Sequence, residues 1–275
     1  MKTVILFPSA DMPKIRLNKG ILIMQIGAQL YTLRTYLQTE SDIRLSLEKV
    51  AKMGYRYIQV SGMGKIDPHL LREICDQLEL KIVLTHNPAE RFLNDVDGLI
   101  EEHNILGCDY IGLGMMPEKY GNIYWIDQFG KDFLEPAKKI AAAGKLFMYH
   151  NHNFEFERLS DGRLLMEHLL DQLPAELMGI TLDTYWVQAG GADIYQWLDI
   201  LQDRIPCVHF KDMAVSGWNP IMAPVGDGNL NFPAIVKKLN ELGKTKYALV
   251  EQDTCQGSPF DCLQRSHDYL RSLGL

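Results

Sequence analysis

The chain has 275 residues, of which 47% are hydrophobic and 23% charged, and its formal net charge is −7 at pH 7. This composition is typical of a globular protein with a sizeable core and excludes a disordered chain. The acidic balance argues against nucleic-acid binding, which requires clustered Lys and Arg. No apolar run is long enough to span a membrane. The five cysteines show no C-x-x-C spacing, so we expect reduced thiols and a cytoplasmic protein.

The first 23 residues differ from the rest of the chain and are interpreted as an N-terminal extension. Their short apolar run is interrupted by Asp11, Lys14 and Arg16, and it is too short for a typical signal peptide. Met24 directly precedes the first convincing strand, which makes it an alternative start of the protein. We therefore expect an extension over residues 1–23 and one domain over residues 24–275.

Short apolar runs alternate with longer amphipathic stretches along the whole domain. The predicted strands are Gln25–Tyr31, Tyr57–Ser61, Lys81–His86, Tyr110–Gly114, Leu146–His152, Met178–Asp183, Pro206–Lys211 and Tyr247–Gln252. The predicted helices are Ser41–Met53, Pro68–Leu78, Phe92–Leu106, Phe133–Ala143, Leu164–Leu173, Ile194–Leu201, Phe232–Leu242 and Ser258–Leu273. Eight βα units in about 250 residues predict an α/β fold, a closed (β/α)8 TIM barrel. An open doubly wound sheet is the alternative, but no G-x-G-x-x-G follows the first strand.

Polar side chains collect where the predicted strands end, mainly in the second half of the chain. They are His86, His150, His152, Asp183, His209, Lys211 and Glu251. In a TIM barrel these ends form the face that carries the active site. Side chains two apart on a strand share a face, so His150 points the same way as His152, and His209 the same way as Lys211.

Glu251 follows the apolar run Ala248–Val250, and a buried carboxylate at that position costs several kcal/mol unless it is paired or metal-bound. A cation held by carboxylates and an imidazole would satisfy it. Such a ligand set suits Mn²⁺, Mg²⁺ or Co²⁺ better than structural zinc or copper. We therefore expect one divalent metal ion as cofactor.

Several motifs resemble those of the xylose isomerase-like barrels, the sugar phosphate isomerase/epimerase family. They are Tyr149–His152 with Glu155–Phe156, Leu182–Asp183 with Trp186, Val208–Asp212, Val225–Gly228 and Val250–Asp253. The resemblance implies one divalent metal held by a Glu, an Asp, a His and a Glu from four successive strands. Asp183, His209 and Glu251 match that pattern. On the fifth strand an imidazole stands near the usual Glu position, so Glu155 is the first choice of fourth ligand, and His152 or His150 is the second.

The resemblance implies a metal-dependent isomerase or epimerase that acts on a keto-sugar or related polyol ketone. The reaction would be α-proton abstraction with stabilisation of the enediolate. The candidate catalytic residues are His152, Glu251 and Lys211, and the candidate substrate-binding residues are His86, His150 and Trp186. Lys211 could instead be only an ion-pair partner, and Trp186 could be part of the core.

Other activities stay open at this point. The imidazoles of the fifth strand favour a dehydratase or lyase on an inosose or a 3-keto-glycoside as the alternative, because a His can act as base and then as acid. An apurinic endonuclease and a non-catalytic sugar-binding barrel are further alternatives, disfavoured respectively by the acidic charge and by the metal-ligand pattern. The expected partner is a small sugar or sugar derivative rather than nucleic acid or membrane, and a homo-oligomer is compatible with the sequence.

Overall fold

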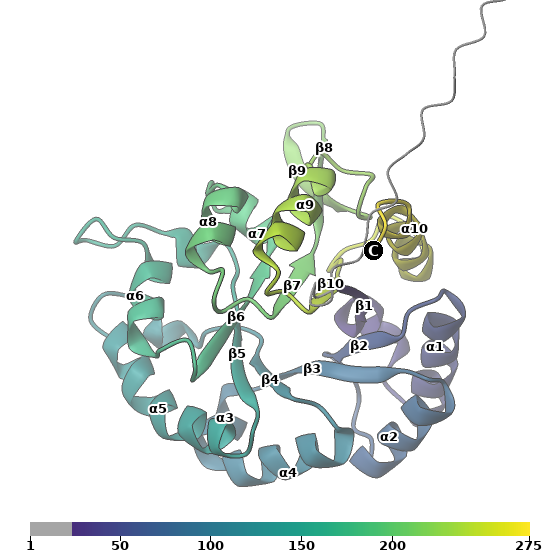
Figure 1. The fold of residues 1–275 in the computed structure, drawn as a ribbon, viewed down its shortest axis with the longest axis horizontal. Helices are drawn as coiled ribbons and strands as arrows, with labels where there is room; N and C mark the ends of the chain where they lie inside the picture. Colours follow the sequence, from purple (N-terminus) through teal and green to yellow (C-terminus); the bar gives the residue numbers. More distant parts are fainter. Residues whose placement is uncertain (1–23) are drawn as a thin grey trace, which may run out of the picture.

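A closed barrel of parallel strands forms the centre of the molecule (Figure 1). The computed structural model describes residues 24–275, and the predicted extension over residues 1–23 lies outside the described part. Neighbouring strands follow the order β1-β10-β7-β6-β5-β4-β3-β2. They are β1 (Gln25–Gln29), β2 (Tyr57–Val60), β3 (Lys81–Asn87), β4 (Tyr110–Leu113), β5 (Leu146–His150), β6 (Met178–Asp183), β7 (Cys207–Phe210) and β10 (Tyr247–Val250). The predicted TIM barrel and its eight strands are confirmed.

Helices follow the strands and surround the barrel (Figure 1). The α-helices are α1 (Glu40–Lys52), α2 (Pro68–Gln77), α3 (Ala89–Asn94), α4 (Val96–Leu106), α5 (Ile126–Ala142), α6 (Leu165–Gln172), α7 (Thr184–Ala189), α8 (Ile194–Ile200), α9 (Phe232–Leu242) and α10 (Pro259–Ser272). Three short 3₁₀ segments, η1 (Leu30–Tyr36), η2 (Glu118–Tyr120) and η3 (Phe154–Phe156), follow β1, β4 and β5. Within residues 24–275, no helix has both the length and the apolar character needed to cross a bilayer.

Two helix predictions are corrected, and one helix was not predicted. The predicted helix Phe92–Leu106 is divided, because Asp95 adopts φ −148° and ψ 41° between α3 and α4. Helix α5 begins at Ile126, seven residues before the predicted start, and continues through Gly130 and Pro136. Gly130 allows α5 to approach α6 closely, since a Cβ there would lie 2.6 Å from Gln172 Oε1. Helix α7 was not predicted; it is only six residues long.

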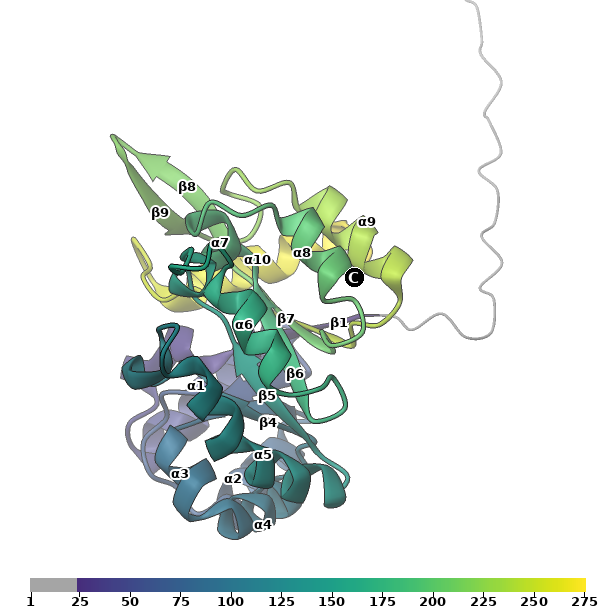
Figure 2. The same ribbon diagram turned by 90° about the vertical axis from the view of Figure 1, so that its left-hand side faces the viewer.

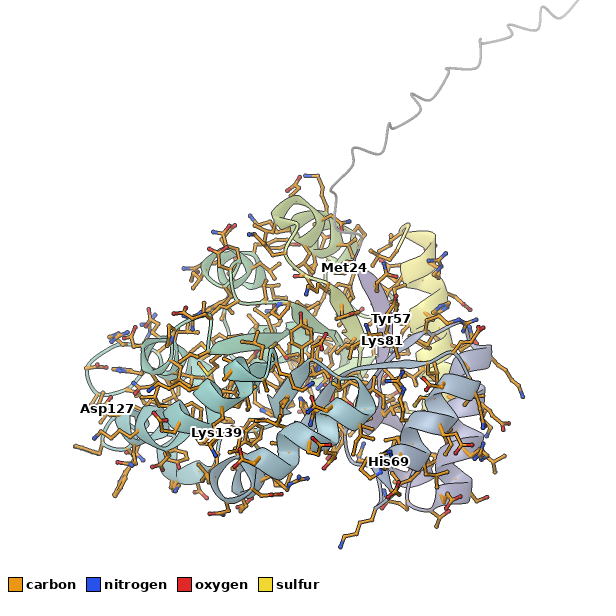
Figure 3. All side chains as sticks on the ribbon, turned by 60° about the horizontal axis from the view of Figure 1, so that its bottom comes forward. Met24, Tyr57, His69, Lys81, Asp127 and Lys139 are labelled. Carbon is orange, nitrogen blue, oxygen red and sulfur yellow. The ribbon has the colours of Figure 1, made fainter. Side chains whose placement is uncertain are left out.

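Apolar side chains fill the barrel interior and leave only one end for polar groups. Val83, Leu84, Tyr110, Met148, Cys207 and Leu249 form a buried cluster inside. Two interior glycines make room for it: a Cβ at Gly27 would lie 2.6 Å from Leu249 Cδ2, and one at Gly179 would lie 2.5 Å from Met148 Sδ. Tyr57 and Lys81 begin β2 and β3 as register partners and lie near each other in Figure 3.

The outer surface of the helices carries polar residues, which accounts for the amphipathic pattern in the sequence. His69 on α2 and Asp127 and Lys139 on α5 lie at the outside of the molecule in Figure 3. Lys139 forms an exposed 2.7 Å ion pair with Asp97 of α4. All five cysteines are free thiols, and only Cys255 among them is partly exposed.

A hairpin that the sequence analysis missed extends from the end of β7. Its antiparallel strands β8 (Asp212–Ser216) and β9 (Asn219–Ala223) project away from the barrel, on the side opposite the chain's C-terminus (Figure 2). Much of the hairpin faces solvent: Val215 is 61% exposed and Trp218 98% exposed. With little burial, neither strand has the apolar pattern that marks the barrel strands.

The motif Val225–Gly228 wraps around the carboxylate of Asp212. Asp212 accepts hydrogen bonds from the backbone N–H groups of Met213 (2.7 Å), Gly226 (2.9 Å), Gly228 (3.1 Å) and Leu230 (3.1 Å). Gly226 has φ +96°, and a Cβ there would lie 2.4 Å from the Tyr269 ring. These amides are therefore used internally to anchor the loop that follows the hairpin.

We predict that Asp212→Ala lowers the free energy of unfolding by more than about 2 kcal/mol, because it leaves several buried N–H donors without an acceptor. Urea denaturation provides the measurement. Asp97→Ala removes an exposed ion pair and serves as the control, with an expected change within about 0.5 kcal/mol. Equal stabilities of the two variants would show that the Asp212 contacts do not hold this loop.

Candidate functional site

The carboxyl ends of four strands bring a cluster of ionisable side chains together. His150 ends β5, Asp183 ends β6, His209 lies in β7 and Glu251 directly follows β10. One ligand atom from each of these four residues lies within 4.8 Å of the other three, and all four residues are buried. Lys211, just beyond β7, reaches the same cluster. Parallel strands end at one rim of the barrel, which explains why residues about 100 positions apart meet here.

The outer nitrogens of both imidazoles are fixed by carbonyl oxygens. His150 Nδ1 lies 3.0 Å from the carbonyl oxygen of Gly114, and His209 Nε2 lies 2.7 Å from Gln59 Oε1. Because a carbonyl oxygen only accepts, these ring nitrogens carry the protons. In the neutral imidazoles, His150 Nε2 and His209 Nδ1 then present lone pairs to the cluster, which is the usual orientation of metal-binding histidines.

Carboxylate oxygens face these lone pairs. Asp183 Oδ2 lies 3.2 Å from His150 Nε2, and Glu251 Oε2 lies 3.0 Å from His209 Nδ1. Among the described residues, neither His209 Nδ1 nor Glu251 Oε2 has a partner of hydrogen-bonding geometry. A lone pair facing a carboxylate requires either a proton or a cation between them. The donor set, with His209 Nδ1 left without a hydrogen-bond partner among the described residues, therefore fits a divalent metal ion.

Lys211 supplies the positive charge of the cluster. Its Nζ lies 2.9 Å from Glu251 Oε2 and 3.1 Å from both Asp183 Oδ2 and Asp253 Oδ2, and the side chain is 1% exposed. Burial alone would raise the pKa of Asp183 and Glu251, but the Lys211 ammonium and the neighbouring imidazoles of His150 and His209 together outweigh it and hold both pKa values well below their usual range. Burial lowers the pKa of His209, yet the Glu251 and Asp183 carboxylates produce a net increase.

Gln29 connects the cluster to the first strand. Its Nε2 donates a 2.6 Å hydrogen bond to Glu251 Oε1, and its Oε1 accepts from the backbone N–H of Tyr31 at 2.6 Å. The opposite oxygen of Glu251 is thereby left for Lys211 and His209. Asp183 is oriented in the same way, since its Oδ1 accepts from the backbone N–H of Trp186 at 3.0 Å.

Glu155, the first choice of fourth ligand, does not reach the cluster. Its Oε1 accepts a 2.5 Å hydrogen bond from the Tyr149 hydroxyl, and its Oε2 accepts from the backbone N–H of His152 at 2.8 Å. Burial raises the pKa of Glu155 to about 7. The structure places the imidazole of His150, one of the second choices, beside Asp183 instead. The strand-5 residue of the cluster is thus His150, which lies in β5 itself. Glu155 lies in the η3 turn, where its carboxylate bonds to Tyr149 and to the His152 amide.

A cavity of about 490 Å³ opens directly next to the cluster. Its lining includes His86, His150, His152, Lys211 and Glu251, which the sequence analysis selected, together with Tyr31, Arg34, Ser61, Asn87, Met115, Asp253 and Thr254. Asp183 and His209 are fully buried beneath this surface. Trp186 also lies outside the lining; its ring is 5.3 Å from Lys211 Nζ and 5.4 Å from the His152 ring.

The two other cavity histidines are neutral near pH 7. Burial, reinforced by neighbouring histidines, lowers the pKa of His86 well below its usual value and that of His152 to about 3. His86 Nδ1 lies 3.3 Å from Ser61 Oγ. His86 Nε2 and His152 Nδ1 are buried without a partner among the described residues. Glycines make space for His86, since a Cβ at Gly114 would lie 2.9 Å from His86 Nδ1.

Sequence reasoning missed the residues that support the cluster. Gln29, Gln59 and Asp253 all contact it, yet none was assigned a role. A signal was present in the first two, because Gln29 and Gln59 are amides at the ends of otherwise apolar strands and are fully buried.

Comparison with known proteins supports the resemblance to the xylose isomerase-like barrels. The family model described as xylose isomerase-like TIM barrel matches residues 47–273. No curated protein matches the chain. Solved structures with the same fold include a sugar phosphate isomerase/epimerase from Parabacteroides distasonis, with 24% identity, a TM-score of 0.76 and coverage of 95% of this chain and 98% of that chain.

Two more distant structures share the fold. L-ribulose 3-epimerase has 14% identity and a TM-score of 0.71, with coverage of 91% of this chain and 94% of that chain. The probable 3-DHS dehydratase from Bacillus anthracis has 14% identity and a TM-score of 0.69, with coverage of 90% and 99%. The match of the family model over most of the chain confirms the resemblance, and with it the expectation of an enzyme. The chain belongs to the xylose isomerase-like TIM barrel family.

Proposed function

We propose that the protein is a divalent-metal-dependent isomerase or epimerase that acts on a keto-sugar or related polyol ketone. The observation that carries the proposal is the four-residue cluster His150, Asp183, His209 and Glu251, whose ligand atoms lie within 4.8 Å of one another beside the cavity. Two imidazoles with two carboxylates favour Mn²⁺ or Co²⁺ over Mg²⁺, which prefers oxygen ligands. A divalent ion in this position supplies Lewis-acid stabilisation of negative charge on the substrate oxygens.

His152 is the proposed base. It lines the cavity, and its Nδ1 has no hydrogen-bond partner among the described residues, so this nitrogen is available to a substrate proton. Lys211 is the proposed donor to the substrate oxygens, because it lines the cavity and its ammonium is held at the cluster. His86 offers its unpartnered Nε2 to a substrate hydroxyl. Glu251 Oε1 is held by Gln29, which favours a ligand role over proton transfer for this residue.

A dehydratase or lyase acting on an inosose or 3-keto-glycoside is the second candidate. Imidazoles from β3 and β5 line the cavity, and an imidazolium formed by α-proton abstraction can protonate a departing β-oxygen. An isomerase or epimerase instead returns the proton to another carbon or face. The two candidates share the first step and differ in their products.

The proposed substrate, compartment and oligomeric state follow from the same reading of the site. The partner is a small sugar or sugar derivative in the cytoplasm. A net charge of −7 makes nucleic acid an unsuitable substrate, and therefore disfavours the apurinic endonuclease. A homo-oligomer is compatible with this function, and light scattering would establish the oligomeric state.

Deuterium exchange provides the experiment. Keto-sugars, inososes and 3-keto-glucosides are incubated with the protein in D₂O, with Mn²⁺ or with EDTA, and read by NMR. Mn²⁺-dependent incorporation at the α-carbon is expected, and the product separates isomerisation from elimination. Binding of a sugar with neither α-proton exchange nor bound metal would favour the non-catalytic barrel instead. Exchange that proceeds equally in EDTA would contradict the metal requirement.

We predict that Glu251→Gln weakens Mn²⁺ binding more than about tenfold and slows exchange at least about 100-fold, because it removes a ligand charge without changing core volume. Calorimetric titration and the D₂O assay provide the measurements. Glu157→Gln, at an exposed position, is the matched control. Unchanged metal content and turnover in Glu251→Gln would remove this residue from the site.

Lys211 contacts the same carboxylate oxygens that a metal ion would use. We therefore predict that Lys211→Met binds Mn²⁺ at least about tenfold more tightly than the wild type, because the competing ammonium is gone. Its exchange activity should nevertheless fall. Lys238→Met, which removes a lysine paired with Asp199 on the helical surface, should change neither quantity. Weaker Mn²⁺ binding in Lys211→Met would mean that the lysine organises the ligands instead of competing for them.

The raised pKa of Glu155 predicts a pH-dependent contribution to stability. Folding moves this pKa from 4.5 to about 7, so between these values the folded state holds a proton that the unfolded state releases. The contribution of Glu155 is present below about pH 4.5 and is lost as the pH rises towards 7. Urea denaturation of EDTA-treated protein should show that Glu155→Gln loses this part of the decline, whereas Glu157→Gln keeps it. Parallel profiles for wild type and Glu155→Gln would contradict the assignment.

A further inference from the structure

Arg34 lies at the rim of the cavity without an acidic partner. It follows β1 on the η1 turn, is half-buried and belongs to the cavity lining. Its guanidinium stacks over the Tyr31 ring at 4.3 Å, and Nη1 donates to the Tyr31 carbonyl oxygen at 3.0 Å. Both contacts fix the guanidinium plane, and no other hydrogen bond from the Arg34 side chain is found within residues 24–275.

The charges of the cavity isolate this guanidinium further. Arg34 and Lys211 are the basic side chains of the lining, and Lys211 is shared by three carboxylates. Across residues 24–275, no carboxylate oxygen lies within 4.0 Å of the Arg34 side chain. Arg44, Arg56, Arg158 and Arg204 also lack such a partner, but among these arginines Arg34 is the one that lines the cavity. Lys211 already forms ion pairs with Glu251 and Asp253, so within residues 24–275 Arg34 is the cationic side chain of the lining that has no carboxylate partner.

Arg34 is also connected to the metal-type cluster through the backbone. Tyr31, on which it stacks, donates its N–H to Gln29 Oε1, and Gln29 Nε2 donates to Glu251 Oε1. The guanidinium and the cluster are therefore held in one frame by β1 and η1. Arg34 lines the same cavity as His150 and Glu251 of the cluster, so one substrate can contact both.

We propose that Arg34 binds an anionic group of the substrate, and that this group is a carboxylate. The inference rests on the proposed function and names its substrate class: a ketose acid, with the keto end at the cluster and the carboxylate at the rim. A planar guanidinium matches a carboxylate in a two-point hydrogen-bonded pair. A phosphate dianion carries more charge and usually has more than one cationic partner, whereas this rim supplies one.

The test uses three ketohexoses that differ only at carbon 6: D-fructose, D-fructuronate and D-fructose 6-phosphate. Their affinities are measured by calorimetry on Mn²⁺-saturated and on EDTA-treated protein. The wild type should bind D-fructuronate at least about tenfold more tightly than D-fructose, and more tightly than the phosphate ester. Equal affinities, a preference for the phosphate ester, or no binding of D-fructuronate would each overturn the carboxylate assignment.

Variants locate the effect at Arg34. Arg34→Met should abolish the preference for D-fructuronate, and Arg34→Lys should keep part of it, because the charge remains but the planar fork is lost. Arg56→Met is the matched control: Arg56 also donates to backbone carbonyls, but it precedes β2 at the opposite end of the barrel. A preference that survives in Arg34→Met would overturn the proposal.

The experiments distinguish a failure of the Arg34 proposal from a failure of the proposed isomerase or epimerase activity. Metal-dependent exchange with neutral ketoses, combined with no Arg34-dependent preference, would refute only the role of Arg34. Conversely, Arg34-dependent binding of D-fructuronate without any metal-dependent exchange would refute only the isomerase.

Discussion

Burial of several carboxylates at one end of a barrel is the constraint on which the site depends. Asp183 and Glu251 are at most 3% exposed, and ionised groups in such a position are costly unless they are paired. Lys211 compensates them, and the fixed imidazoles of His150 and His209 direct lone pairs towards them. The cluster is therefore built to hold positive charge, whether an ammonium, a proton or a metal ion.

The rest of the fold places and orients these charged groups. Apolar side chains and close-packed glycines fill the lower barrel, which confines polar groups to the other rim. Amides from neighbouring strands, Gln29 and Gln59, then orient the charged groups. The hairpin after β7 is anchored by Asp212, directly after Lys211, so that the loop beyond the strand is fixed by hydrogen bonds of its own.

Much of this organisation could be predicted from the sequence, because the barrel strands are short, apolar and separated by amphipathic helices. Five of the selected residues, His86, His150, His152, Lys211 and Glu251, line one cavity. The hairpin β8–β9 escaped prediction because it buries little surface and lacks the apolar alternation. The position of Glu155 outside the cluster could not be predicted, because nearness in sequence does not show where a side chain points: its carboxylate is held by Tyr149 and the His152 amide. A role for Arg34 could not be predicted from the sequence, because its position in the cavity lining and its lack of a carboxylate partner within residues 24–275 are visible only in the structure.

We propose above that the four-residue cluster is a divalent cation site. Diffraction from Mn²⁺-soaked crystals at the manganese absorption edge tests it most directly. We expect one anomalous peak per chain among His150 Nε2, Asp183, His209 Nδ1 and Glu251, with the Lys211 ammonium moved away from Asp183. A peak at Glu155, or no peak at the cluster in Mn²⁺-soaked crystals, would contradict it.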